Sequence, residues 1–315
     1  MRRALVSLLA AALLAAPACA GSDPAPASAD PNAMGPSGPL AGPGVTGPTS
    51  DSGTTTADPE LPSPDAWIPR RPGALADDLE TTRGERRQAI ERWIAADGPS
   101  IWPPPEDVQL LTLYEQRIYR ILAANDRLSE QVLGRLDMAI AGEARANVRA
   151  GGALYDHFHP VKTLPDFRTR SPEPADTLLV YFEKGERRFG VHWELLAAVM
   201  LIETRMGRIA SNSSAGAQGP MQFIPSTWAA YGLGGDVRDP HDAVLGAANY
   251  LSANGAPGDD RQALFHYNPV PAYVTAVTRY AKAMERDRDL FYAYYNWQVF
   301  VRTTRGDVRL TGPGL

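Results

Sequence analysis

Hydrophobic residues recur at helical spacing through much of the chain after its first quarter. In residues 75–96, Ile90 and Ile94 fall on one face, and apolar positions three or four residues apart predict an amphipathic helix. A second helix is expected to start at Pro105, because Pro followed by acids is typical of a first helical turn. A third is expected near residues 125–152. Its apolar stripe is Leu128, Val132, Leu136 and Ile140.

These patterns divide the chain into segments. Residues 75–165 form a predicted helical accessory region, and helical patterns resume over 172–290 after a Pro-containing connector. An aromatic extension and tail, 291–315, follows. Its aromatic residues are expected to pack in the interior, although aromatics also line carbohydrate grooves. The fold predicted for the ordered part is mainly α.

The N-terminus carries an export signal. Arg2 and Arg3 precede an apolar stretch that is too short to span a membrane as a mature helix, so residues 1–20 are predicted to be a signal peptide. Cys19 is the only cysteine. Two outcomes fit: cleavage before Cys19 with lipidation there, or ordinary cleavage at Ala18-Cys19-Ala20, which releases a soluble protein.

Residues 21–74 contain 8 Gly and 12 Pro. This composition leaves too few large apolar residues for a core and predicts a disordered tether. The net charge of the whole chain is −5, which gives no basic footprint for nucleic acid. Because of the predicted signal peptide and Cys19, the protein is expected in the bacterial cell envelope after export, as a membrane-anchored lipoprotein or a secreted protein.

Glu203 is the main candidate for chemistry. It ends an apolar helical run that starts at Leu195, and the segment 204–235 contains no other acid. Partial burial on such a helix raises the pKa of a carboxyl and keeps it protonated near neutral pH. Cleavage of a glycosidic bond needs a proton donor of this kind. The alternative is an exposed Glu at a helix end.

The residues that follow form an ordered motif: Glu203, Ser213, Gly216-Ala217, Met221-Gln222-Phe223 and Tyr267-Asn268. The motif resembles the lytic murein transglycosylases, whose lysozyme-like domain carries a catalytic Glu, a Ser-containing Gly-Ala loop and a Gly-X-Met-Gln segment. The resemblance covers roughly residues 176–285 and is specific because the elements occur in order. The segment 222–228 and the Asp239-Pro240 turn look most like membrane-bound lytic transglycosylase B, whereas the short spacing from Glu to Gly-Ala looks more like the soluble branch.

The resemblance implies roles for these residues. Glu203 would act first as acid and then as base. Ser213 and Tyr267 would hydrogen-bond the reacting sugar, and Gln222 would bind sugar and brace Glu203. Met221 and Phe223 would form an apolar wall, and Asn268 would orient the Tyr267 turn. For each residue the alternative is a purely structural role. The implied substrate is the peptidoglycan glycan strand, with no cofactor.

No metal site is predicted. His157 and His159 lack a nearby cluster of cysteines or acids. Asp236, Asp239 and Asp242 lack the spacing and the closing Glu of a calcium loop. One of these aspartates could still act as a second carboxylate, which would favour a goose-type lysozyme that hydrolyses the same bond. A non-catalytic peptidoglycan-binding lipoprotein is the third hypothesis.

Overall fold

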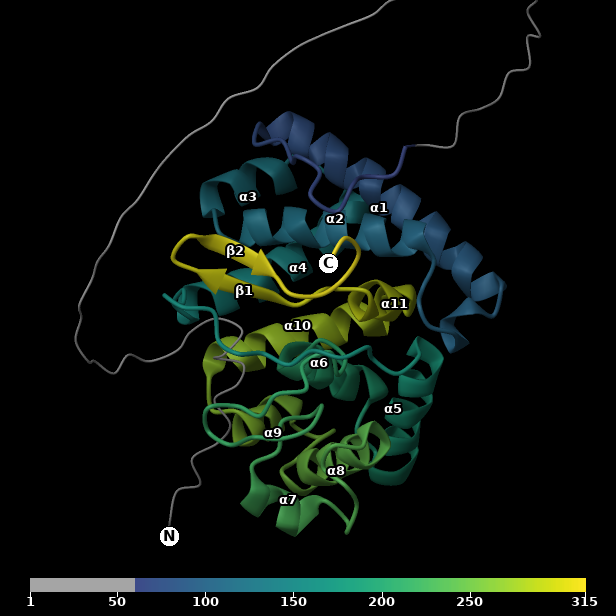
Figure 1. The fold of residues 1–315 in the computed structure, drawn as a ribbon, viewed down its shortest axis with the longest axis vertical. Coiled ribbons are helices and arrows are strands. Elements are labelled where there is room, and N and C mark those ends of the chain that lie inside the picture. Colours follow the sequence, from purple (N-terminus) through teal and green to yellow (C-terminus); the bar gives the residue numbers. More distant parts are fainter. Residues whose placement is uncertain (1–59) are drawn as a thin grey trace, which may run out of the picture. The chain divides into compact units, whose positions relative to one another are not determined.

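The computed structural model describes residues 60–315. The predicted signal peptide, Cys19 and most of the predicted tether lie outside the described residues. In the part that is described, eleven α-helices, one 3₁₀ turn and one two-stranded hairpin form the fold (Figure 1). The prediction of a mainly α fold is confirmed.

The predicted tether extends to residue 74, and its last part differs from that prediction. Ile68 is 5% exposed within the hydrophobic core, and the first helix already begins at Pro72. Proline suits the first position of a helix, because its missing N–H has no partner there anyway. The ordered chain therefore starts before the composition of residues 21–74 suggests.

The accessory region contains four helices and a 3₁₀ turn. They are α1 (Pro72–Ala95), η1 (Gly98–Ser100), α2 (Glu106–Ala123), α3 (Asp126–Leu133) and α4 (Met138–His157). The start of α2 after Pro105 agrees with the prediction.

The single helix predicted near residues 125–152 is wrong, because the structure has two. Asn125 caps α3 by accepting a hydrogen bond from the Leu128 amide, and Asp137 caps α4 by accepting one from the Ala139 amide. A side-chain acceptor at the N-cap fixes a helix start, so Asp137 begins a new helix. The helix also continues through Gly151. A Cβ at Gly151 would lie 3.1 Å from the Cβ of Ala123, so a glycine eases the approach of α4 to α2.

Six helices follow in the region predicted to be catalytic. They are α5 (Ala175–Phe189), α6 (Trp193–Thr204), α7 (Pro225–Tyr231), α8 (Pro240–Ala253), α9 (Asp260–Tyr267) and α10 (Pro271–Arg286). All residues of α6 except Glu194 are buried, and α5, α10 and α11 pack against it (Figure 1). An apolar helix of this kind is stable only at the centre of a fold.

The aromatic extension forms α11 (Asp289–Tyr295), followed by the antiparallel strands β1 (Phe300–Thr303) and β2 (Gly306–Arg309). The aromatic residues of α11 are buried in the core, as expected of packing residues. The hairpin was not predicted. Beside it, the side chain of Gln116 on α2 and the backbone of Gln298 exchange hydrogen bonds of 2.8 and 2.9 Å.

Helix α10 packs on both α4 and α6, so the regions predicted to be accessory and catalytic share one hydrophobic core (Figure 1). Residues 61–315 form one compact unit. No helix within the described residues is long and apolar enough to cross a membrane.

Candidate active site

Helix α6 carries Glu203 into the interior. The helix ends at Thr204. Its C-cap residue, Arg205, has a φ of 53°, and Gly207 continues the turn with a φ of 84°. The Thr204 hydroxyl accepts a hydrogen bond from the Gly207 amide at 3.0 Å and donates one to the Pro220 carbonyl at 2.7 Å. The C-terminal end of α6 is therefore tied to the turn that carries Met221 and Gln222.

The Glu203 carboxyl is completely buried, with 0% exposure. Burial raises its pKa to about 8, and the nearby Tyr273 hydroxyl opposes this rise. Neither carboxyl oxygen has a partner in good hydrogen-bonding geometry. Desolvation without a compensating cation favours the neutral acid, so Glu203 is protonated at neutral pH and can donate a proton.

Two tyrosines lie close to Glu203. Burial is the main reason that the pKa values of Tyr267 and Tyr273 are raised well above the usual range, and the charge of Glu203 adds to the effect. Tyr267 ends α9 and donates its hydroxyl proton to the Met221 carbonyl at 2.6 Å. The Tyr267 hydroxyl was predicted to hydrogen-bond the sugar. In this conformation its proton is used by the Met221 carbonyl instead, so Tyr267 stabilises the turn that contains Met221.

Tyr273 was not among the predicted site residues. Its hydroxyl is buried and lacks a partner in good hydrogen-bonding geometry, but it lies close enough to Glu203 to influence its pKa. The sequence signal that could have found it is the Ala272-Tyr273-Val274 stretch, which closely follows Tyr267-Asn268. The sequence does not show that α10 brings this side chain to the end of α6.

The turn between Gln218 and Phe223 is a tight backbone loop. These two residues exchange both backbone hydrogen bonds, each 2.9 Å long. Gly219 has a φ of 73°, and a Cβ there would lie 1.7 Å from the Val237 carbonyl oxygen. Only glycine fits this position. The turn therefore presents Met221 and Gln222 in a fixed backbone conformation.

The turn's side chains are buried. Gln222 has a φ of 51° and donates from Nε2 to the Gly219 carbonyl at 2.8 Å. Met221 and Phe223 belong to the hydrophobic core, and the Phe223 ring lies 5.9 Å from that of Tyr267. Both side chains are therefore apolar and buried beside Tyr267, and their role as an apolar wall for the acid stays a prediction.

Ser213 and Asn268 hold local backbone structure. The Ser213 hydroxyl oxygen accepts from the Ala217 amide at 2.8 Å and from the Ala215 amide at 3.1 Å. Asn268 follows α9, and its backbone amide donates to the Leu264 carbonyl. Since Ser213 uses only its acceptor capacity in these bonds, its hydroxyl proton is left for another group.

The three aspartates considered as second carboxylates lie around the start of α8. Asp239 caps that helix, and Asp242 accepts a hydrogen bond from the Asp236 amide at 3.0 Å. That backbone bond is the main reason that the pKa of Asp242 is lowered. The candidate metal ligands of Asp239, His241 and Asp242 lie within 4.8 Å of one another. However, the Lys184 ammonium is 2.7 Å from Nε2 of His241, so a cation already lies beside this group.

Every predicted site residue in the described part of the chain is buried, with at most 7% exposure. These residues are Glu203, Ser213, Met221, Gln222, Phe223, Tyr267 and Asn268. The structure thus brings Glu203, Tyr267 and the turn together in an enclosed conformation. A sugar can reach the carboxyl only if the surrounding elements separate.

Residues 180–290 match the family model of the transglycosylase SLT domain. The match runs from within α5 to the start of α11 and includes all seven of these residues. No curated protein and no solved structure matched the chain. Residues 180–290, about a third of the chain, therefore form a transglycosylase SLT domain, which is lysozyme-like. Helices α1 to α4 lie outside the matched segment.

Proposed function

We propose that the protein is a peptidoglycan lytic transglycosylase. It cleaves the β-1,4 bond between MurNAc and GlcNAc and leaves a 1,6-anhydro-MurNAc end. The observation that carries this proposal is the isolation of Glu203. Burial raises its pKa to about 8, and within residues 60–315 no second carboxylate contributes to that shift. Glycosidases that use two carboxylates place them on either side of the bond.

One carboxyl is sufficient for the anhydro-forming reaction. Protonated Glu203 donates its proton to the glycosidic oxygen as the bond to C1 breaks, and the N-acetyl group of the substrate stabilises the positive charge at C1. The Glu203 carboxylate then takes the proton of the C6 hydroxyl as O6 bonds to C1. The acid is regenerated and no water is consumed. A raised pKa suits both steps, because the same group must donate and accept a proton near neutral pH.

The surrounding residues have supporting roles in this proposal. The Tyr273 hydroxyl stabilises the Glu203 carboxylate between the two steps, because a hydrogen bond to the charged form favours it. Ser213, Gln222 and Tyr267 contact the reacting sugar once the site opens. Met221 and Phe223 keep the carboxyl dry, and Asn268 orients the turn after α9.

The cellular setting is part of the same proposal. The protein is exported to the bacterial cell envelope, where its partners are glycan strands. It is either anchored through a lipid on Cys19 or secreted. Either form places an enzyme with this chemistry at its substrate.

Replacement of Glu203 by Gln tests the proposal. The amide cannot donate the catalytic proton, so we expect cleavage of purified peptidoglycan to stop while the protein still sediments with it. Unchanged cleavage would contradict the role of Glu203. A wild-type protein that binds but does not cleave would favour the non-catalytic peptidoglycan-binding hypothesis instead.

A further inference from the structure

A large cavity lies away from the predicted site residues. Its volume is about 1170 Å³, and it is lined by parts of α2, α3, α4, the C-terminal hairpin and the segment before α1. None of the predicted site residues lines it, although Ile202 and Arg205, on either side of Glu203 in the chain, do. Most of its lining lies outside the segment that matches the SLT domain.

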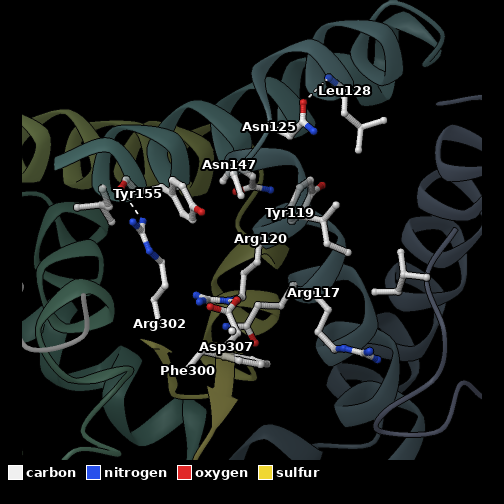
Figure 2. Close-up of a pocket in the computed structure, with 18 of the residues that line it drawn as sticks. Arg117, Tyr119, Arg120, Asn125, Leu128, Asn147, Tyr155, Phe300, Arg302 and Asp307 are labelled. Carbon is white, nitrogen blue, oxygen red and sulfur yellow. Dashed lines mark hydrogen bonds and ion pairs between the residues drawn. The ribbon is translucent and has the colours of Figure 1, made fainter. Parts of the chain in front are cut away.

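The charge of the cavity is opposite to that of the chain. Seven arginines and two aspartates line it, although the net charge of the chain is −5. Both aspartates are paired with lining arginines, Asp307 with Arg120 at 2.8 Å and Asp65 with Arg309 at 3.8 Å, so five arginines remain without a carboxylate partner from the lining. Figure 2 shows Arg120 and Arg302 reaching into the cavity from α2 and β1. The excess of arginine side chains favours an anionic ligand.

Buried donors in the lining point to the same kind of ligand. Nε1 of Trp297 and Nε of Arg205 are buried and have no hydrogen-bond partner. Nδ2 of Asn147 is buried beside Tyr119, with which the amide interacts, but it has no partner in good hydrogen-bonding geometry. All three residues line the cavity. Each of these atoms is an N–H donor. Buried polar groups normally have a hydrogen-bond partner. Donors without one at a cavity wall indicate a ligand that supplies the acceptors. A ligand rich in acceptor oxygens would provide those partners.

The size of the cavity and its mixed lining favour a large organic anion over an inorganic one. Its volume of about 1170 Å³ exceeds the usual range for small-molecule sites, about 300–1,000 Å³, so a single inorganic ion would leave most of it empty. Apolar and aromatic side chains, including Leu128, Tyr155 and Phe300, also line the cavity (Figure 2). The central guanidinium carbon of Arg302 lies 3.7 Å from the centroid of the Tyr155 ring, and its Nη1 donates to the Tyr155 carbonyl at 2.7 Å. These contacts fix the planar group, and its remaining N–H donors can bind a carboxylate.

We propose that this cavity binds a short peptide that carries several carboxylates. The peptide stems of peptidoglycan belong to this chemical class, and naming them as the source rests on the proposed function. A stem bound here would hold the cell-wall polymer through the accessory helices, separately from the bond that is cleaved. The contact with Arg205 would bring the bound peptide to the end of α6, the helix that carries Glu203.

Calorimetric titration of the full chain with the synthetic tripeptide alanyl-γ-glutamyl-diaminopimelate tests this proposal. We expect saturable binding, loss of binding when the carboxylates of the peptide are amidated, and no comparable binding of inorganic phosphate. Arg302→Gln is expected to raise Kd at least tenfold. Arg127→Gln, at an exposed lining position, repeats the test with less risk to folding. Arg145→Gln on α4 removes the same charge outside the lining and should leave Kd unchanged.

The outcomes separate this site from the catalytic proposal. Glu203→Gln should bind the tripeptide as the wild type does, because Glu203 does not line the cavity. Binding that depends on Arg302 supports the site even if the wild type cleaves nothing. Absence of binding, equal Kd values for Arg302→Gln and Arg145→Gln, or preferential binding of phosphate would overturn it.

Discussion

The hydroxyl of Tyr273 on α10 lies beside the carboxyl of Glu203 on α6, and both side chains are completely buried. This hydroxyl opposes the rise in the pKa of Glu203 that burial causes. The pair therefore combines an apolar environment that favours the neutral acid with one donor that stabilises the carboxylate.

Tyr273→Phe removes that donor. We expect the pKa of Glu203 to rise further and peptidoglycan cleavage to slow roughly tenfold or more, because a hydrogen bond to a charged group contributes about 1.5–3 kcal/mol. The pH–rate profile measures the shift: its basic limb should move to higher pH. Tyr280→Phe removes a hydroxyl from the same helix and should leave the limb in place. Identical profiles for the two variants would rule out this role of Tyr273.

The wild-type pH–rate profile reports on Glu203 directly. The proton donor must be neutral in the free enzyme, and burial raises its pKa to about 8. We expect kcat/KM to be retained through neutral pH and to fall as pH rises through about 8. A fall near the ordinary pKa of a glutamic acid, 4.5, would show that the acid acts in a solvated environment, contrary to the buried site.

Burial of the Glu203 carboxyl lowers the free energy of unfolding as pH rises. The folded-state pKa of Glu203 is above its unfolded value of 4.5, so the folded state holds more protons between pH 4.5 and 8 and stability falls as pH rises through this window. At about 1.4 kcal/mol per unit, the cost reaches about 3 kcal/mol by pH 7.

Urea denaturation measures this cost. Relative to Glu203→Gln, the wild type should lose unfolding free energy steadily from about pH 4.5 to about pH 8, and the difference should be constant below that window. Parallel pH profiles for the two proteins would mean that Glu203 is not desolvated in the folded state.

Gly219 and Gly216 make a matched pair for testing the turn. Both have positive φ, but a Cβ at Gly219 meets the Val237 carbonyl oxygen at 1.7 Å, whereas a Cβ at Gly216 meets nothing within 4 Å. We expect Gly216→Ala to cost about 1–2 kcal/mol, the left-handed backbone penalty. Gly219→Ala should cost more than about 4 kcal/mol because backbone must move. Equal unfolding free energies for the two variants would contradict the packing of the turn against Val237.

Local patterns predicted the parts of the structure that local interactions determine. The start of α2 after Pro105 and the burial of the run ending in Glu203 follow from proline geometry and apolar composition. The break before α4 depends on a single side chain, Asp137, which caps a helix inside an otherwise continuous apolar stripe. The regular spacing of the apolar residues gives no sign that a helix ends and a new one begins there.

Features that join distant segments were not predicted. The short β1–β2 hairpin lies beside α2, and Arg120 on α2 pairs with Asp307 on β2, 187 residues further along the chain. Tyr273 approaches Glu203 only because α10 packs on α6. The cavity likewise gathers arginines from segments far apart in the sequence. Each of these contacts joins residues that the tertiary fold brings together. Local patterns in one sequence do not reveal such long-range contacts.

Mass spectrometry of the muropeptides that the full chain releases from purified peptidoglycan tests the central claim most directly. The proposed mechanism uses one carboxyl and no water, so the products should be about 18 mass units lighter than the hydrolytic ones. Glu203→Gln should release neither kind. Products with reducing ends would contradict the mechanism and would indicate a goose-type hydrolase that uses a second carboxylate, with Asp236, Asp239 and Asp242 as the first candidates.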